Sequence, residues 1–177
     1  MIDINLIISL VVFYFVMYVT PGPNNTIVLS SGLQFGFIKT IPVMAGITAG
    51  HVLQLVLVCL GLGKVFHSFP QVQTVLKILC SVYILYLGYR IIGSISKVEE
   101  NEIKPVTFSQ AAIFQIVNPK AWTISSMAAS SFLAKDVSLY ISIPLLAAVS
   151  SIICPISISP WAAFGSAIRK FISNNRI

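Results

Sequence analysis

The chain has 177 residues, of which 56% are hydrophobic and only 9% are charged, whereas soluble domains carry about 25% charged residues. With roughly 20 residues needed for each spanning helix, it has room for five or six helices and for no separate catalytic domain, so we expect an all-α integral membrane protein that is not an enzyme. Its net charge of +6 is spread between the apolar runs without forming a patch, which argues against nucleic acid as a partner.

The first apolar segment, about residues 4–36, contains a break that a spanning helix would not normally carry. Proline and glycine release backbone groups from helical hydrogen bonds, and released groups are tolerated at membrane depth only where they line a cavity or contact protein. The alternative is a simple kink between two helix pieces, with the asparagines capping the second piece. The residues of this break are Pro21, Gly22, Pro23, Asn24 and Asn25.

The second segment, about residues 40–63, contains His51. Histidine gains and loses a proton near neutral pH, so His51 is a candidate proton carrier. A buried histidine whose ring is hydrogen-bonded to a carbonyl group is at least as good an interpretation, and the two remain open from the sequence.

Two pairs of glycines occur at a spacing of four residues, Gly32 with Gly36 and Gly46 with Gly50. This spacing places both glycines of a pair on one helix face and lets another helix approach closely. We therefore expect these glycines to serve packing and not ligand binding.

A third segment covers about residues 72–92, and a charged loop follows at 97–107. The loop divides a single transmembrane domain, residues 1–177, into a first half at 1–96 and a second half at 108–177. No other stretch of the chain is strongly charged.

The fourth segment, about residues 108–133, contains a second break at Asn118, Pro119 and Lys120. A lysine at the centre of a spanning helix costs about 2.5 to 3.5 kcal/mol on insertion scales, and no Asp or Glu lies deep in an apolar segment to pair with it. Its partners must then be carbonyl groups, water or a substrate carboxylate. The alternative is that Lys120 lies near the membrane surface and extends its amine to water.

The fifth segment, about residues 137–164, contains Pro144, Pro155 and Pro160. We expect these prolines to bend or fray the helix, and the helix to face protein or a cavity where the freed backbone groups can be satisfied.

Three cysteines, Cys59, Cys80 and Cys154, stand singly in apolar segments without metal-ligand spacing. We expect small buried hydrophobic side chains, and neither a metal site nor a cofactor. A membrane thiol oxidoreductase would need paired cysteines beside the helix breaks, so it is a remote alternative.

The two breaks occupy corresponding places in the two halves, which is typical of a transporter binding site. Freed amides at a half-helix favour a carboxylate, and unwound carbonyl groups favour an ammonium or another cation. An amino acid presents both groups. The sequence therefore predicts an amino-acid transporter, with Lys120 as the cation of the site.

The sequence also resembles the LysE/RhtB family of amino-acid exporters over essentially its whole length. The resemblance implies an inner-membrane, multi-pass exporter that moves amino acids or their derivatives out of the cytoplasm in exchange for protons, with lipid as its surroundings and two three-helix halves. The family's two elements correspond to Pro21 to Asn24 and to Asn118 to Lys120. The matching residues are Thr20, Pro21, Gly22, Pro23, Asn24, Gly32, Gly36, Gly46, Gly50, Leu76, Lys77, Tyr83, Tyr86, Leu87, Gly88, Arg90, Asn118, Pro119, Lys120, Ala121, Trp161, Gly165 and Arg169.

One departure concerns the end of the sequence, because members of the family usually continue into a sixth helix and this sequence stops at Ile177. We expect either a natural short form or a truncated one, in which a homo-oligomer partner would fill the open wall of the cavity. The alternative function is that of a truncated, non-transporting or regulatory membrane relative.

Overall fold

The computed structural model describes residues 4–62, 68–96, 105–133 and 138–174, and the regular structure of these residues is entirely helical. This confirms the all-α fold predicted from the composition. The charged loop falls almost wholly outside the described residues. In chain order the elements are α1 (Ile4–Val19), α2 (Pro23–Phe35), α3 (Phe37–Leu57), a short π-helical turn η1 (Val58–Leu62), α5 (Pro70–Ser96), α6 (Phe108–Val117), α7 (Pro119–Phe132) and α8 (Leu139–Asn174).

Two stretches of helix are long and apolar enough to cross a membrane, Phe37–Gly61 and Leu139–Asn174. Helices α1 and α2 meet this criterion only as a pair, bent by 59° at the first break. Among the described residues, length and composition thus support two spans, or three when the bent pair counts as one. The third predicted segment corresponds to α5 and the fourth to α6 and α7. Their described residues contribute two shorter apolar helices, Thr74–Tyr86 and Phe108–Val117.

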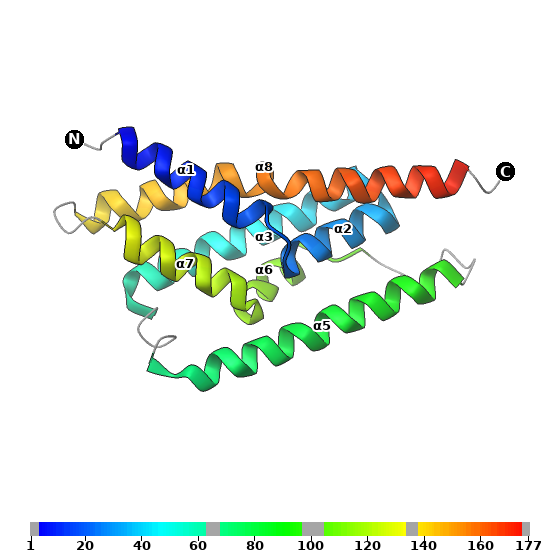
Figure 1. The fold of residues 1–177 in the computed structure, drawn as a ribbon, viewed down its shortest axis with the longest axis horizontal. Helices are drawn as coiled ribbons and strands as arrows, with labels where there is room; N and C mark the ends of the chain where they lie inside the picture. The colour runs from blue at the N-terminus through cyan, green and yellow to red at the C-terminus, as the bar shows by residue number, and fades with distance from the viewer. Residues whose placement is uncertain (1–3, 63–67, 97–104, 134–137, 175–177) are drawn as a thin grey trace.

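Helix α8 runs along one side of the molecule, where α1, α2 and α3 pack against it (Figure 1). On the opposite side of Figure 1, the long helix α5 crosses the molecule and packs against α2, α6 and α7. Helices α6 and α7 lie between them, with α6 packed against α3. Both helix breaks are therefore placed in the middle of the bundle, between α8 and α5.

Glycines allow α3 and α6 to pack with their backbones in contact. A methyl group added to Gly46 would collide with the carbonyl group of Phe108, and one added to Gly50 would collide with the carbonyl group of Ala112. Both glycines therefore have the packing role that their spacing predicts.

The other glycine pair divides its roles. Gly32 lies against the carbonyl group of Ala162 on α8, as the prediction requires. Gly36 has a φ of 84° and ends α2 by donating its N–H to the carbonyl oxygen of Gly32 at 2.9 Å. The packing role predicted for Gly36 is therefore wrong, because this residue forms the turn between α2 and α3 and needs a left-handed conformation that glycine adopts without strain.

The three prolines of α8 do not end the helix, which continues through all of them to Asn174. Proline at position 160 cannot donate to the carbonyl oxygen four residues earlier. The hydroxyl of Ser159 donates to this oxygen, on Ile156, at 2.9 Å. Of the two outcomes expected for this segment, bending or fraying, fraying does not occur, since a neighbouring side chain replaces one of the lost backbone bonds.

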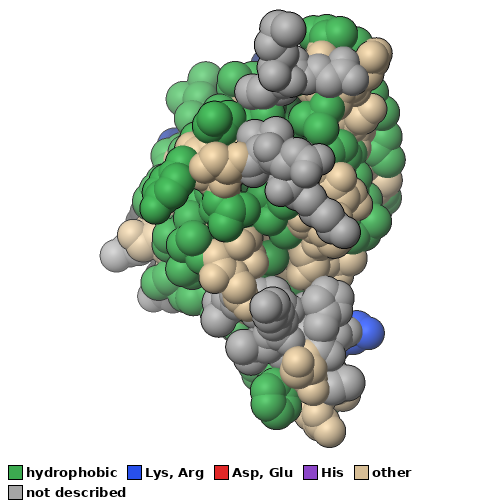
Figure 2. Space-filling model, turned by 90° about the vertical axis from the view of Figure 1, so that its left-hand side faces the viewer, with side chains coloured by type: hydrophobic (Ala, Val, Ile, Leu, Met, Phe, Trp, Pro, Cys, Tyr) green, Lys and Arg blue, Asp and Glu red, His purple; other side chains and the backbone are tan. Residues whose placement is uncertain are grey.

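The outer surface of the helices is apolar. Ile8 and Val12 of α1, and Val82 and Leu85 of α5, are all more than half exposed, and hydrophobic side chains cover much of the described surface in Figure 2. A protein in water would not expose apolar side chains so extensively. Such a surface suits contact with lipid.

Candidate functional site

The first break leaves the carbonyl groups at the end of α1 without helical partners, and side chains from other elements bind them. The amide of Asn25 donates to the carbonyl oxygens of Tyr18 at 2.9 Å and Thr20 at 2.7 Å. The indole of Trp161, on α8, donates to that of Val19 at 3.1 Å. Asn25 thus binds the end of the first helix piece, whereas the kink interpretation expects it to cap the second.

The second break is confined to one residue. Asn118 has an extended backbone with φ −81° and ψ 105°, and its side-chain oxygen accepts the N–H of Lys120 at 3.1 Å. Pro119 follows at the first position of α7, where its missing N–H costs nothing. An asparagine cap followed by proline therefore starts a new helix here.

Three amide side chains join the two breaks. Asn24 and Gln115 exchange two hydrogen bonds of 3.0 Å each, and the amide of Asn118 donates to the same oxygen of Asn24 at 3.0 Å. Gln115 is only 1% exposed and Asn118 also 1%. The structure thus ties α2 directly to the end of α6 and the start of α7.

Lys120 completes the link between the breaks. Its Nζ donates to the carbonyl oxygen of Thr20 at 2.6 Å, to the hydroxyl of Thr20 at 2.8 Å and to the carbonyl oxygen of Pro21 at 3.3 Å. All five acidic residues of the chain fall outside the described residues. The ammonium group is therefore held by neutral oxygens, and the carbonyl groups among them are one of the three kinds of partner that the sequence left open.

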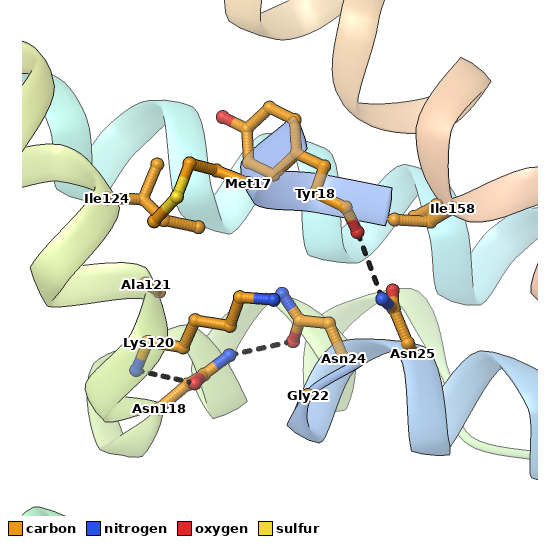
Figure 3. A pocket seen from close by; sticks show the side chains of 10 residues that line it. All are labelled: Met17, Tyr18, Gly22, Asn24, Asn25, Asn118, Lys120, Ala121, Ile124 and Ile158. Atoms are coloured by element: carbon orange, nitrogen blue, oxygen red, sulfur yellow. Dashed lines mark hydrogen bonds between the residues drawn. The ribbon is translucent and has the colours of Figure 1, made fainter. Parts of the chain in front are cut away.

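A small pocket opens at this meeting point, with a polar wall and an apolar wall (Figure 3). It has room for about one water molecule, so an amino acid enters only if the helices or Lys120 move. Of the predicted site residues, Gly22, Asn24, Asn25, Asn118 and Lys120 line it. The remaining lining residues are Met17, Tyr18, Ala121, Ile124 and Ile158.

The three prolines of the breaks contribute to this site through their backbone and through the helices that they begin. Pro21 contributes its carbonyl oxygen to Lys120, while Pro23 and Pro119 begin α2 and α7. None of the three lines the pocket.

His51 lies outside the pocket, behind one of its walls. Its ring is 1% exposed and packs edge-on against the ring of Tyr18, with 5.2 Å between the ring centres. Neither ring nitrogen has a hydrogen-bond partner among the described residues. The sequence left open that His51 is a buried histidine hydrogen-bonded to a carbonyl group. No such carbonyl partner is found among the described residues.

Further buried polar groups have no protein partner within the described residues. They are the hydroxyl of Tyr14, the amide of Gln54 and the hydroxyls of Ser125 and Ser126, on α1, α3 and α7. Buried polar groups are seldom left unpaired, and ordered water commonly satisfies them. We expect water between these helices.

Sequence reasoning missed Gln115 and Tyr18. Gln115 stands one helical turn before Asn118 in an otherwise apolar stretch, and a buried amide at this spacing was the available signal. Tyr18 carries no such signal, since a tyrosine in an apolar helix is common.

The three cysteines are not among the residues that line the pocket. All are free thiols, with Cys80 and Cys154 buried and Cys59 partly buried. The described residues also contain no cluster of side chains that could hold a metal ion.

Fold and site together define an all-α membrane protein whose polar centre is built from two broken helices. Residues 15–176 match the model of the LysE type translocator family, so the chain belongs to this family.

Among its relatives are cysteine/O-acetylserine efflux proteins of Escherichia coli strain K12 and of Shigella flexneri serotype 5b. Each is 32% identical over 114 residues, which covers 64% of this chain and 58% of the relative. The match thus spans little more than half the length of these relatives. No solved structure matches the chain.

Proposed function

We propose that this protein exports a small neutral amino acid or amino-acid derivative from the cytoplasm across the bacterial inner membrane, as a multi-pass carrier. The observation that supports this function best is the meeting of the two helix breaks, where the Lys120 ammonium lies on the released carbonyl groups of Thr20 and Pro21. The name of the relatives, cysteine/O-acetylserine efflux protein, supports a substrate of this size for the present chain.

The chemistry of the pocket suits a zwitterion with a small side chain. Lys120 supplies a positive charge for a carboxylate, and the unwound end of α1 supplies carbonyl oxygens for an ammonium group. Met17, Ile124 and Ile158 supply an apolar wall. The described residues include no Asp or Glu. They therefore offer no carboxylate that could pair with a cationic side chain of a substrate.

Export is tested with purified protein in vesicles that are loaded with radiolabelled amino acids and placed under a proton gradient. We expect cysteine, O-acetylserine or another small neutral amino acid to leave these vesicles faster than it leaves protein-free vesicles, and lysine to be retained. Equal release of every amino acid from both kinds of vesicle would contradict the proposal.

We further propose that protons drive export and that His51 carries them. Two observations support this role: its ring nitrogens have no protein partner in the described part of the chain, and it contacts Tyr18, which lines the pocket. Glutamine can form hydrogen bonds at this position but cannot titrate in the range of histidine.

The change His51→Gln tests the proton carrier. We expect wild-type export to fall as the pH rises and the histidine loses its proton, and the variant to lose most of this pH dependence. Export rates across a pH series measure the effect, and the thermal midpoint of the variant in detergent checks its folding. A variant with the wild-type pH profile would assign His51 to packing.

A further inference from the structure

We propose that, in the arrangement seen here, the ammonium group of Lys120 occupies the subsite that receives the ammonium group of the substrate. Lys120 must then leave this place before an amino acid binds. The inference rests on the proposed function, because it assigns a substrate group to the same site, and it explains why the pocket is too small for an amino acid.

The acceptors match a primary ammonium group in number and kind. Such a group carries three N–H donors, and Lys120 directs its Nζ at three oxygens: the carbonyl and hydroxyl of Thr20 and the carbonyl of Pro21. The α-ammonium of an amino acid offers the same three donors. Two ammonium groups cannot share these oxygens, because they would collide and repel each other.

The stem of Lys120 fills the space beside these acceptors. A methyl group on Gly22 would lie 2.8 Å from Cδ and 3.2 Å from Nζ of Lys120, so the glycine leaves the room that the lysine takes. With the lysine in place, the pocket has room for about one water molecule. The side chain of Lys120 therefore holds the volume that a substrate needs.

The surrounding structure allows the lysine to leave. Asn118 and Pro119 start α7 without help from the Lys120 side chain, and the carbonyl group of Thr20 keeps its bond from Asn25. Lys120 is only half-buried. When Lys120 leaves, both helices therefore stay intact, and the carbonyl oxygen of Thr20 still accepts a hydrogen bond from Asn25.

The exchange gives the site a preference for zwitterions. A simple amine that displaced Lys120 would leave the ammonium of the lysine without an anionic partner and add a second positive charge nearby. An amino acid brings a carboxylate that pairs with the displaced lysine. The class of ligand is therefore a molecule with an ammonium and a carboxylate group a few bonds apart.

The variant Lys120→Ala tests this subsite with ethylammonium, a primary ammonium ion without a carboxylate. Loss of the lysine empties the three oxygens, so we expect ethylammonium to bind the variant at least about tenfold more tightly than the wild type, the ratio that one hydrogen bond to a charged group supplies. Calorimetric titration of the purified proteins in detergent measures the affinities.

Two controls restrict the result to this subsite. Tetramethylammonium has no N–H donors, and we expect no gain with it. Lys77→Ala removes an exposed lysine of α5, and we expect it to bind ethylammonium no better than the wild type. Adding Thr20→Val to Lys120→Ala removes one acceptor and should reverse part of the gain.

The outcomes separate the subsite from the proposed function. No gain for Lys120→Ala, or an equal gain with tetramethylammonium, would overturn the subsite even if the wild type exports amino acids. A gain in a protein whose wild type exports nothing would support the subsite and reject the function. If Lys120→Ala does not fold, Lys120→Ser replaces it under the same expectations.

Discussion

Replacing Lys120 with methionine is expected to remove most of the amino-acid export while the amount of protein in the membrane stays near normal. Methionine keeps an unbranched stem beside Gly22 but removes the charge that would pair with a substrate carboxylate. Hydrogen bonds to charged groups contribute about 1.5 to 3 kcal/mol, so we expect export to fall by about tenfold to more than a hundredfold. Efflux from loaded vesicles and immunoblots of membrane fractions provide the measurements.

A matched control is Lys77→Met on α5, whose side chain is exposed and does not line the pocket. We expect it to export at the wild-type rate. Undiminished export by Lys120→Met would instead assign Lys120 to the membrane surface, as a residue that extends its amine to water.

Replacing Gly46 with leucine is expected to separate α3 from α6 and to destabilise the whole bundle. Even a methyl group at this position would collide with the backbone of Phe108, and backbone cannot move aside as a side chain does. Overpacking costs about 1 to 3 kcal/mol and occasionally more, and we expect a collision with backbone to lie at the upper end of this range. Thermal unfolding in detergent should show a midpoint lowered by several degrees or a protein that does not accumulate.

The neighbouring residue provides the control for this change. Ala45 lies on the same helix but is exposed, so Ala45→Leu adds the same side chain toward the surroundings of the bundle. We expect an almost unchanged midpoint. Equal destabilisation by the two substitutions would show that leucine disturbs α3 itself and that the contact with α6 is not the cause.

Proline and asparagine carry local signals, so the positions of both breaks could be predicted from the sequence. Proline removes a donor wherever it stands, and Asn118 followed by Pro119 is a helix start by its own chemistry. The oxygen partners of Lys120 also followed from elimination, since no acidic residue lies deep in an apolar segment.

The sequence could not predict which side chains donate hydrogen bonds to the freed carbonyl groups. Asn25 and Trp161 bind the end of α1 from two other helices, and such pairings depend on packing between residues far apart in the chain. The continuity of α8 was missed for a similar reason. The hydroxyl of Ser159 donates to the carbonyl oxygen that Pro160 cannot bind. A prediction from the proline alone does not take such a neighbouring side chain into account.

The contact between Lys120 and Thr20, which are 100 residues apart, also bears on how the chain is assembled in the membrane. The ribosome delivers the first half before the second, so the oxygens of the first break are already in place when α7 emerges. Without them, α7 would carry its charge into lipid at a cost of about 2.5 to 3.5 kcal/mol. We therefore expect the first half to serve as a docking partner during biosynthesis, and insertion of α7 to depend on the earlier arrival of α1 and α2.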